Sequence, residues 1–294
     1  MISVGEAFEK FRSRLELTEK EQTDASSRQI ELREVMNGAF AIAEDFLTGS
    51  YRRWTKTKPL KDVDIFCVLD EKERPKYRTG QRPSVVLAAT ERVLANEYGQ
   101  ASVVRQRRSV SVRFKVSGNE ERVMSFDVVP AFTKGDHYEI PDTANPMGWT
   151  ETNPKVHAEK ATAANEAFGG EWKGMVRMAK RWNQEKDKPV KPSFLLEVMA
   201  LDLLQPPFKG NYPREFMALF ASAADRIEET WPDPAGLGPP VSDSMDQTAR
   251  GIAKQALNSA KDAIRDAMEL AKSGRNGEAL RKYRELFGDL FPLS

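Results

Sequence analysis

The sequence predicts an α+β protein with a short mixed sheet in its first half and helices in its second half. Two observations predict the sheet: residues 109–116 alternate apolar and polar side chains, and residues 62–69 form a short, mostly apolar run. A third observation predicts the helical half, because apolar residues recur at helical spacing through most of the chain beyond about residue 150. No internal repeat or low-complexity tract is visible.

Periodicity, together with the residues that interrupt it, predicts the individual elements. The helices expected from this pattern cover residues 3–19, 23–46, 83–99, 171–187, 246–272 and 275–287. The strands expected cover residues 62–69, 109–116 and 123–132. Gly118-Asn119 is the expected turn between the last two strands, and the proline- and glycine-rich stretch Trp231–Pro240 interrupts the helical half.

Composition argues against several classes of protein. Hydrophobic residues make up 40% and charged residues 30% of the 294 positions, and no apolar run is long enough to cross a membrane. No export signal is visible, so a cytoplasmic location is expected. The single cysteine, Cys67, rules out an internal disulfide and argues against structural zinc. The net charge of +1 lacks the basic surplus typical of proteins that track long nucleic acids, but it is compatible with small nucleotide substrates.

The informative carboxylates are Asp62 and Asp64. Side chains alternate along a strand, so both aspartates project from one face while Val63, Ile65 and Cys67 face the core. Two carboxylates this close repel each other, and a divalent cation with a preference for oxygen ligands is the usual reason for such a pair. The alternative, taken on this pair alone, is two solvated aspartates at the start of a strand.

A third carboxylate, Asp127, lies on the strand expected over residues 123–132, opposite to Phe126 and Val128. If this strand pairs with residues 62–69, three carboxylates converge. Such a set can hold two metal ions about 4 Å apart, one activating an attacking hydroxyl and one neutralising a leaving pyrophosphate. The alternative for Asp127 alone is a polar residue at the edge of a sheet.

Gly49-Ser50 lies thirteen residues before Asp62. Glycine allows the backbone to approach phosphate closely, and a helix that starts there directs free N–H groups toward it. The dipeptide alone is a weak signal. Followed by Asp-x-Asp and a distal aspartate, it becomes a strong one.

This order of motifs resembles that of the polymerase-β nucleotidyltransferase superfamily. The wider context resembles one branch of it, the bacterial cGAS/DncV-like nucleotidyltransferases (CD-NTases) of CBASS antiphage systems, and the likeness spans roughly residues 45–290. The segments that carry it are Gly49 to Arg53, Ser125 to Phe132, Tyr138 to Pro141, Trp149 with Thr152 to Pro154, and Met178 to Asn183.

The resemblance implies a fold and an activity. It implies a polymerase-β-like nucleotidyltransferase core over residues 1–150 and an oligoadenylate-synthase-like helical domain over residues 151–294 that completes the nucleotide-binding cleft. It also implies that Asp62, Asp64 and Asp127 are catalytic residues that hold two Mg²⁺ ions, with Mn²⁺ as a substitute. The expected product is a cyclic di- or trinucleotide made from nucleoside triphosphates, ATP among them.

Three residues of the helical half are implied to bind the donor nucleotide alongside Gly49 and Ser50. Lys180 contacts the triphosphate as a point charge, Ser193 touches phosphate, and Phe194 stacks on the base. Most related enzymes have tyrosine at this last position, so Phe194 keeps the stacking face and loses a hydroxyl. Packing in the core is the alternative for Phe194.

Other noticeable residues receive simpler interpretations. Lys173 and Arg177 are expected on a solvated basic face of the helix over residues 171–187, next to an apolar stripe. The basic run Arg105 to Arg108 is interpreted as a solvated strand end rather than an RNA contact. Cys67 is expected to pack beneath the sheet.

The resemblance also implies partners: a downstream effector that the cyclic product activates, and a regulatory protein such as a HORMA-domain protein. Two alternatives to cyclic nucleotide synthesis stay open. One is a polymerase-β-like transferase that adds nucleotides to an RNA or another acceptor, which the neutral charge disfavours. The other is a non-catalytic module that senses nucleotides, which the presence of all three carboxylates disfavours.

Overall fold

The computed structural model describes residues 2–116 and 119–294, and these form two compact units. The sheet unit comprises Leu17–Arg53 and Pro59–Ala158. The helical unit comprises the N-terminal segment through Glu16, Trp54–Lys58 and Glu159–Ser294. This organisation is less simple than one division near residue 150, because the first helix and a five-residue connecting segment pack with the helices of the second half.

The sheet unit is built on a mixed sheet, which has seven strands in the described part of the chain. The order is β1-β2-β5-β4-β3, with β6 paired to β5 and β7 paired to β6; β2 and β5 run parallel and the other pairs are antiparallel. The strands are β1 (Ile42–Thr48), β2 (Asp62–Leu69), β3 (Val103–Arg105), β4 (Val110–Val116), β5 (Asn119–Lys134), β6 (His137–Pro141) and β7 (Trp149–Thr152).

The three predicted strands are confirmed as β2, β4 and β5, but two predicted helices are partly wrong. The helix expected over residues 3–19 ends at Arg14, and the helix expected over residues 23–46 ends at Ala39. Residues 42–46 continue no helix; they belong to β1, which pairs antiparallel with β2. Phe40, Ala43 and Phe46 recur every three residues and so mimic helical spacing, yet Phe40 caps the preceding helix in an extended conformation. In the expected turn, Gly118 lies outside the described residues and Asn119 begins β5.

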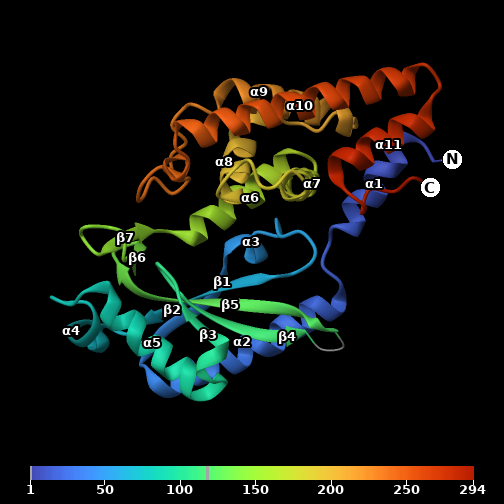
Figure 1. Ribbon diagram of the computed structural model, residues 1–294. Helices are drawn as coiled ribbons and strands as arrows, with labels where there is room; N and C mark the ends of the chain where they lie inside the picture. The colour runs from blue at the N-terminus through green and yellow to red at the C-terminus, as the bar shows by residue number, and fades with distance from the viewer. Residues whose placement is uncertain (1, 117–118) are drawn as a thin grey trace. The chain divides into compact units, whose positions relative to one another are not determined.

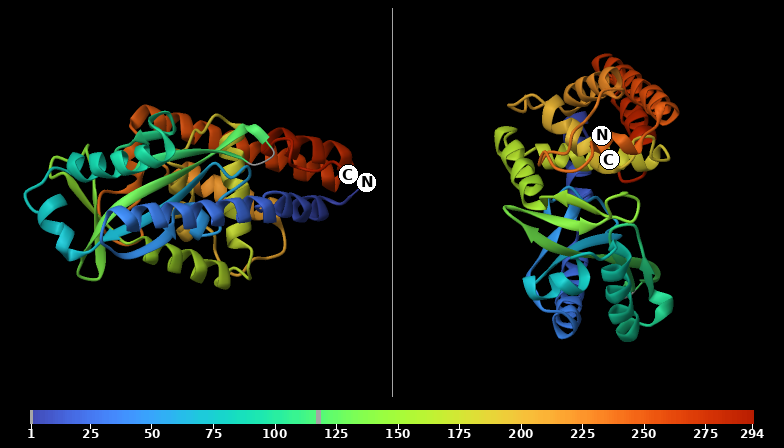
Figure 2. Two further views of the ribbon diagram at one scale, coloured as in Figure 1. Left: turned by 90° about the horizontal axis from the view of Figure 1, so that it is seen from below. Right: turned by 90° about the vertical axis from the view of Figure 1, so that its left-hand side faces the viewer.

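Two helices cover one face of the sheet, as Figures 1 and 2 show for α2 and α5. α2 begins with a capping box in which Thr18 and Glu21 exchange hydrogen bonds, and α5 starts with Pro83 in its first turn. Apolar residues from both helices bury the sheet face that carries Val63 and Ile65. The helices of this unit are α2 (Glu19–Ala39), α3 (Gly49–Arg52), α4 (Arg74–Tyr77) and α5 (Pro83–Tyr98).

The opposite face of the sheet carries a smaller apolar cluster that includes Phe66, Val68 and Val129. Because Cys67 alternates with these residues, its thiol is buried in the larger core beneath the helices, as predicted. The end of this opposite face nearest the start of β2 is not apolar, and it carries the aspartates described below.

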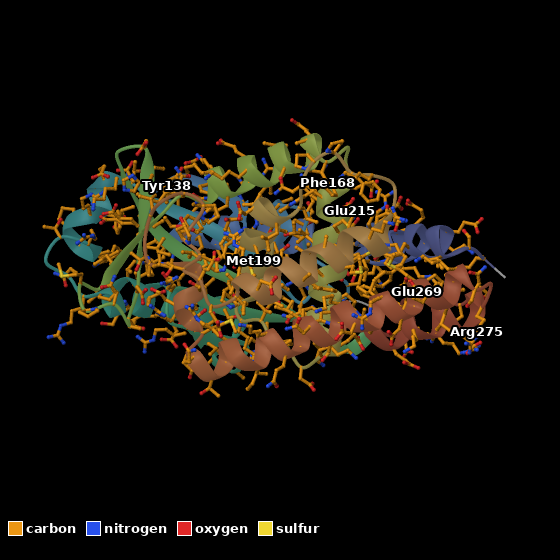
Figure 3. The ribbon with its side chains drawn as sticks, turned by 90° about the horizontal axis from the view of Figure 1, so that it is seen from above. Tyr138, Phe168, Met199, Glu215, Glu269 and Arg275 are labelled. Atoms are coloured by element: carbon orange, nitrogen blue, oxygen red, sulfur yellow. The ribbon has the colours of Figure 1, made fainter. Side chains whose placement is uncertain are left out.

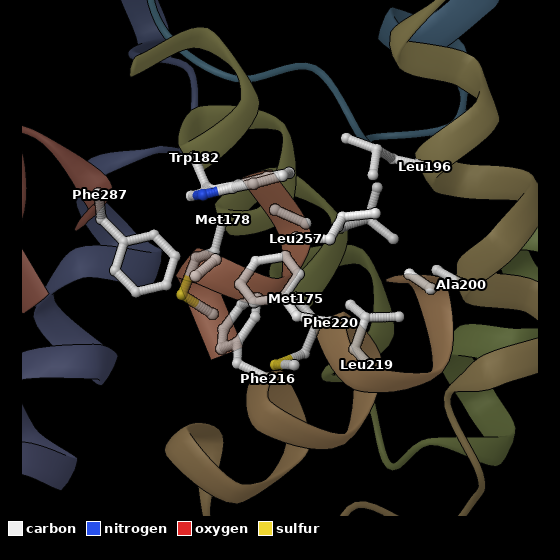
Figure 4. Close-up of a cluster of buried hydrophobic side chains, with 14 of the residues drawn as sticks. Met175, Met178, Trp182, Leu196, Ala200, Phe216, Leu219, Phe220, Leu257 and Phe287 are labelled. Atoms are coloured by element: carbon white, nitrogen blue, oxygen red, sulfur yellow. The ribbon is translucent and has the colours of Figure 1, made fainter. Parts of the chain in front are cut away.

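The helical unit has one large core, part of which Figure 4 shows. The predicted apolar stripe of α7 is confirmed, because Trp172, Met175, Val176, Ala179 and Trp182 are all buried there. The helices are α1 (Val4–Arg14), α6 (Pro154–Ala167), α7 (Trp172–Glu185), α8 (Ser193–Leu203), α9 (Tyr212–Arg226), α10 (Gln247–Lys272) and α11 (Asn276–Phe287). Among the described residues, none of the helices combines the length and apolar character that crossing a bilayer requires.

Candidate functional site

The pairing of β2 with β5 brings the three predicted aspartates onto one face of the sheet. The expected pairing is confirmed: Asp64 lies opposite Asp127 and Asp62 lies opposite Ser125. Partners in a parallel pair project to the same face, and residues 62 and 64 share a face because they are two apart. All three aspartates are half-buried, and neighbouring strands lie about 5 Å apart.

A glycine turn approaches Asp64 from the end of β1. Thr48 pairs with Asp64, and Gly49 follows with φ +65° at the start of α3. A Cβ added to Gly49 would lie 1.7 Å from Oδ2 of Asp64, so the carboxylate could not keep its position beside any other residue. The sequence motif therefore has a steric basis, since only glycine lets this turn lie against the carboxylate.

A further residue, Gln106, lies next to Asp127, although no sequence motif marks it. Its Nε2 donates to Oδ1 of Asp127 at 3.5 Å, and its Oε1 accepts from the hydroxyl of Ser109 at 3.0 Å. The backbone N–H of Gln106 also donates to the carbonyl of Ser109 at 2.9 Å. These bonds close the tip of the β3–β4 hairpin, which is formed by the four residues Gln106 to Ser109 that connect the two strands. Polar residues between two strands were its only sequence signal.

The same hairpin is anchored by a fully buried carboxylate, Asp142. Arg107 donates to both of its oxygens at 2.5 and 2.8 Å, and Nε of Arg108 donates to Oδ2 at 2.9 Å. Burial acting alone would raise the pKa of Asp142, but the two guanidiniums and the N–H of Ala144 hold it well below its usual range. Arg107 and Arg108 are partly exposed to solvent, as expected for the basic run, but they also neutralise this aspartate, which the interpretation as a solvated strand end did not include. Arg105 does end β3 and pairs with Glu91.

The donor atoms at the aspartates fit magnesium. Every candidate ligand is a hard carboxylate oxygen, and the thiol of Cys67 points to the opposite face of β2. Across residues 2–116 and 119–294, no three His, Cys, Asp or Glu side chains are arranged as a complete metal site. The closure of Asp62, Asp64 and Asp127 around ions therefore stays a prediction that rests on the register of the strands and on the chemistry of the oxygens.

The predicted phosphate contact Lys180 is buried in the helical unit. Its Nζ lies 2.5 Å from Oε1 of Glu197, and the ammonium is 3.4 Å from the hydroxyl of Thr55. The hydroxyl of Thr55 donates to the other oxygen of Glu197 at 2.8 Å. The sequence does not single out Thr55 or Glu197. The two residues are far apart in the chain, and no local motif around either one predicts a contact between them.

Arg177, Ser193 and Phe194 of the helical half differ in their exposure to solvent. The solvated face expected for Arg177 is wrong: its side chain is buried, and it donates to the carbonyl of Trp54 at 2.8 Å and to Glu16 at 2.9 Å. Burial lowers the pKa of Arg177, and the Glu16 carboxylate opposes that change. Ser193 is exposed at the start of α8, and Phe194 is half-buried against the helical core, so its stacking role stays a prediction.

In this mixed sheet, the Asp-x-Asp strand pairs in parallel with a strand that bears a third aspartate, and a glycine turn lies against the pair. This combination defines a nucleotidyltransferase of the polymerase-β type. The comparisons with known proteins are more specific. The chain belongs to the family of the Second Messenger Oligonucleotide or Dinucleotide Synthetase (SMODS) domain, whose model matches residues 2–165. The expected CD-NTase membership and the activity class, a nucleotidyltransferase that makes oligonucleotide second messengers, are thereby confirmed.

Individual relatives agree with the family. The chain is 29% identical over 273 residues to a probable cyclic nucleotide synthase of Bacillus cereus (strain VD146), with 83% of this chain and 81% of the relative covered. It is 26% identical to a cyclic AMP-AMP-AMP synthase of Acinetobacter sp., with 85% and 73% covered. The solved structure of E. coli MS115-1 CdnC with ATP has a TM-score of 0.74 at 19% identity and covers 99% of each chain, which confirms the predicted fold class.

Proposed function

We propose that this chain is a magnesium-dependent synthase that joins nucleoside triphosphates into a cyclic di- or trinucleotide. The observation that supports this most strongly is the register of β2 and β5, with Asp64 opposite Asp127 and Asp62 on the same face. The close approach of Gly49 to Asp64 adds to it, because it couples a phosphate-binding turn to a metal-binding carboxylate.

The proposed reaction is nucleotidyl transfer. A ribose hydroxyl oxygen forms a bond to the α-phosphorus of the donor, the bond to the β-phosphate oxygen breaks, and pyrophosphate leaves. When bound, two Mg²⁺ ions would activate the hydroxyl and neutralise the leaving group. Asp62 and Asp64 would hold both ions. Asp127 completes the site and accepts the proton of the acceptor hydroxyl.

The donor nucleotide is held by residues of both halves of the sequence in this proposal. Gly49 and Ser50 cradle the β- and γ-phosphates, Lys180 and Ser193 contact phosphate, and Phe194 stacks on the base. ATP is the proposed substrate, alone or with a second nucleotide. The name of the Acinetobacter relative and the ATP complex of CdnC support this choice.

The proposed function also has a biological setting. We propose that the cyclic product activates an effector in antiphage defence in the cytoplasm. A regulatory partner of the HORMA type is proposed because CdnC has been solved as a complex with HORMA-deltaN.

Incubation with four nucleoside triphosphates and Mg²⁺, without primer, tests the proposal. The expected result is pyrophosphate release and a product that resists phosphatase, whose mass equals that of a ring of two or three nucleotides. Growth of an added RNA primer without any ring would instead support the polymerase-like alternative. Nucleotide binding without pyrophosphate release, with or without a HORMA partner, would support the sensing alternative.

A further inference from the structure

A closed triangle of polar groups lies inside the helical unit, formed by Thr55, Lys180 and Glu197. The Lys180 ammonium lies 2.5 Å from one Glu197 oxygen, and the Thr55 hydroxyl donates to the other oxygen at 2.8 Å. Lys180 also donates to the Thr55 oxygen at 3.4 Å. Both oxygens of the glutamate are therefore engaged, and each corner of the triangle contacts the other two.

The triangle is almost completely removed from solvent. Thr55 is 0% exposed, Glu197 2% and Lys180 5%. Apolar neighbours on α7 and α8, such as Ala179 and Val198, belong to the large core. In such surroundings an ion pair is screened weakly by water, so its geometry is held firmly.

Stability alone does not account for this pair. Desolvating two charges costs about as much as their attraction returns, and replacing a buried ion pair by apolar residues is often neutral or stabilising. A buried pair that contributes little net stability can still fix the orientation of one of its members. Here one member is Lys180, the cation proposed to contact the donor triphosphate.

A second residue of α7 contacts Trp54, the residue before Thr55. Arg177, one turn before Lys180 on α7, donates to the carbonyl of Trp54 at 2.8 Å, and Trp54 has φ +59°. An L-residue in this left-handed region costs about 1–2 kcal/mol, so the contact keeps the backbone in a conformation that it would otherwise leave. α7 and α8 thus fix two consecutive residues of Trp54–Lys58, the segment that follows the Gly49-Ser50 turn in sequence.

We propose that Glu197 is a positioning residue for donor binding, an inference that rests on the proposed function. Its carboxylate holds the Lys180 ammonium in one orientation, and the hydroxyl of Thr55 braces the other oxygen of that carboxylate. The ligand whose binding it controls is the triphosphate group of the donor nucleotide. Glu197 itself does not touch the ligand; it acts through Lys180.

The substitution Glu197→Gln tests this, because glutamine keeps the shape and one acceptor but removes the charge that holds Lys180. The probe is inorganic tripolyphosphate, whose affinity needs no turnover. The dissociation constant is expected to rise about tenfold, which corresponds to about 1.4 kcal/mol. In turnover assays the donor KM should rise by a similar factor while kcat stays within about threefold.

Glu269→Gln is the matched control. Glu269 lies on α10 (Figure 3) and forms an exposed pair with Lys272 at 2.8 Å, so the same chemical change is made in an ion pair of the same unit that is exposed to water. Its tripolyphosphate affinity should match that of the wild type. The unfolding temperature of both variants shows whether the helical unit remains folded.

A double variant separates positioning from general damage. If Glu197 acts through Lys180, the single variant Lys180→Met and the double variant Lys180→Met with Glu197→Gln should bind tripolyphosphate equally weakly. Once the ammonium is absent, the change at residue 197 has no ammonium left to release. The inference is overturned if the two losses add, if folded Glu197→Gln binds as the wild type does, or if the wild type fails to bind tripolyphosphate.

Failure of this inference can be told apart from failure of the proposed function. A wild type that binds tripolyphosphate but releases no pyrophosphate contradicts the proposed synthase, and the comparison of affinities still tests Glu197. A wild type that turns over, with Glu197→Gln unchanged in both affinity and KM, contradicts only the role of Glu197.

Discussion

At the residue scale, the site depends on the absence of a side chain at Gly49. Its φ of +65° lies in the left-handed region, and its missing Cβ would overlap Oδ2 of Asp64. The position therefore excludes other residues for two reasons that can be separated. One is backbone strain, which any such glycine shares, and the other is the collision with a carboxylate, which is particular to this turn.

Gly49→Ala should lower kcat/KM more than about 100-fold, the effect expected when reacting groups are displaced by about an ångström. Gly80→Ala is the control, because Gly80 has φ +66° but open space where its Cβ would lie. Both variants should lose about 1–2 kcal/mol of stability from backbone strain, and only Gly49→Ala should lose activity. Equal activity in the two variants would show that the contact with Asp64 is not needed.

The sequence was sufficient to find Gly49, Ser50 and the three aspartates as candidates, because strand alternation and motif order are local properties. It was not sufficient for Glu197, which is 142 residues from Thr55 and has no local pattern. Arg177 was wrongly expected in solvent, since helical periodicity does not reveal that a backbone carbonyl needs a donor. Charged residues that satisfy distant partners are the ones that sequence patterns miss.

At the element scale, the hairpin Gln106 to Ser109 acts as one unit fixed to Asp142. Arg107 and Arg108 bind the carboxylate, Thr150 donates to it at 3.0 Å, and the N–H of Thr143 donates to the carbonyl of Arg107 at 3.2 Å. The hairpin in turn places the amide of Gln106 beside Asp127. The loop between β6 and β7 thus supports a candidate catalytic strand through this hairpin.

Asp142→Asn should destabilise the protein by about 2 kcal/mol at pH 7, because the buried side chain loses its charge-assisted hydrogen bonds with two partly exposed guanidiniums. The folded pKa of Asp142 is lowered, so its stabilisation is present in full above the unfolded pKa of about 4 and is lost progressively as the pH falls from there toward the lower folded pKa. Urea unfolding at pH 7 and pH 3 measures this. A difference between variant and wild type that does not shrink at pH 3 would contradict the assignment.

Helices were predicted correctly where an apolar stripe extends over several turns. Strands were missed where their conformation depends on pairing with another strand. The helices of the second half, α7, α10 and α11, were predicted almost to their ends because their apolar stripes extend over several turns. β1 was predicted as helix, because its strand conformation is stabilised by pairing with β2, which sequence periodicity does not report. β3 has only three residues, too few for any alternating pattern.

At the scale of the whole molecule, the two ends of the described chain meet in the helical unit. Figure 1 shows α1 beside α11, and Phe8 of α1 lies at the centre of an aromatic cluster. The rings within about 6 Å of Phe8 are those of Tyr212, Phe216, Tyr283, Phe287 and Phe291. The N-terminal helix is therefore part of the core of a unit whose other helices come from the second half of the sequence.

Phe8→Ala should destabilise the helical unit by about 4 kcal/mol, because it leaves a cavity in a fully buried cluster. Ile252→Ala is the control: Ile252 is 56% exposed on α10, so its removal should change stability by less than about 0.5 kcal/mol. Equilibrium unfolding of both variants checks the difference. Similar stabilities would mean that α1 contributes little to this core.

The most direct test of the account is pyrophosphate release from nucleoside triphosphates with Mg²⁺, compared among the wild type, Asp62→Ala, Asp64→Ala and Asp136→Ala. Asp136 has a side chain that is 98% exposed in the turn between β5 and β6, so it controls for loss of an aspartate as such. The account predicts release by the wild type and Asp136→Ala, and none by folded Asp62→Ala or Asp64→Ala. Release at the wild-type rate from either of these two variants would contradict it.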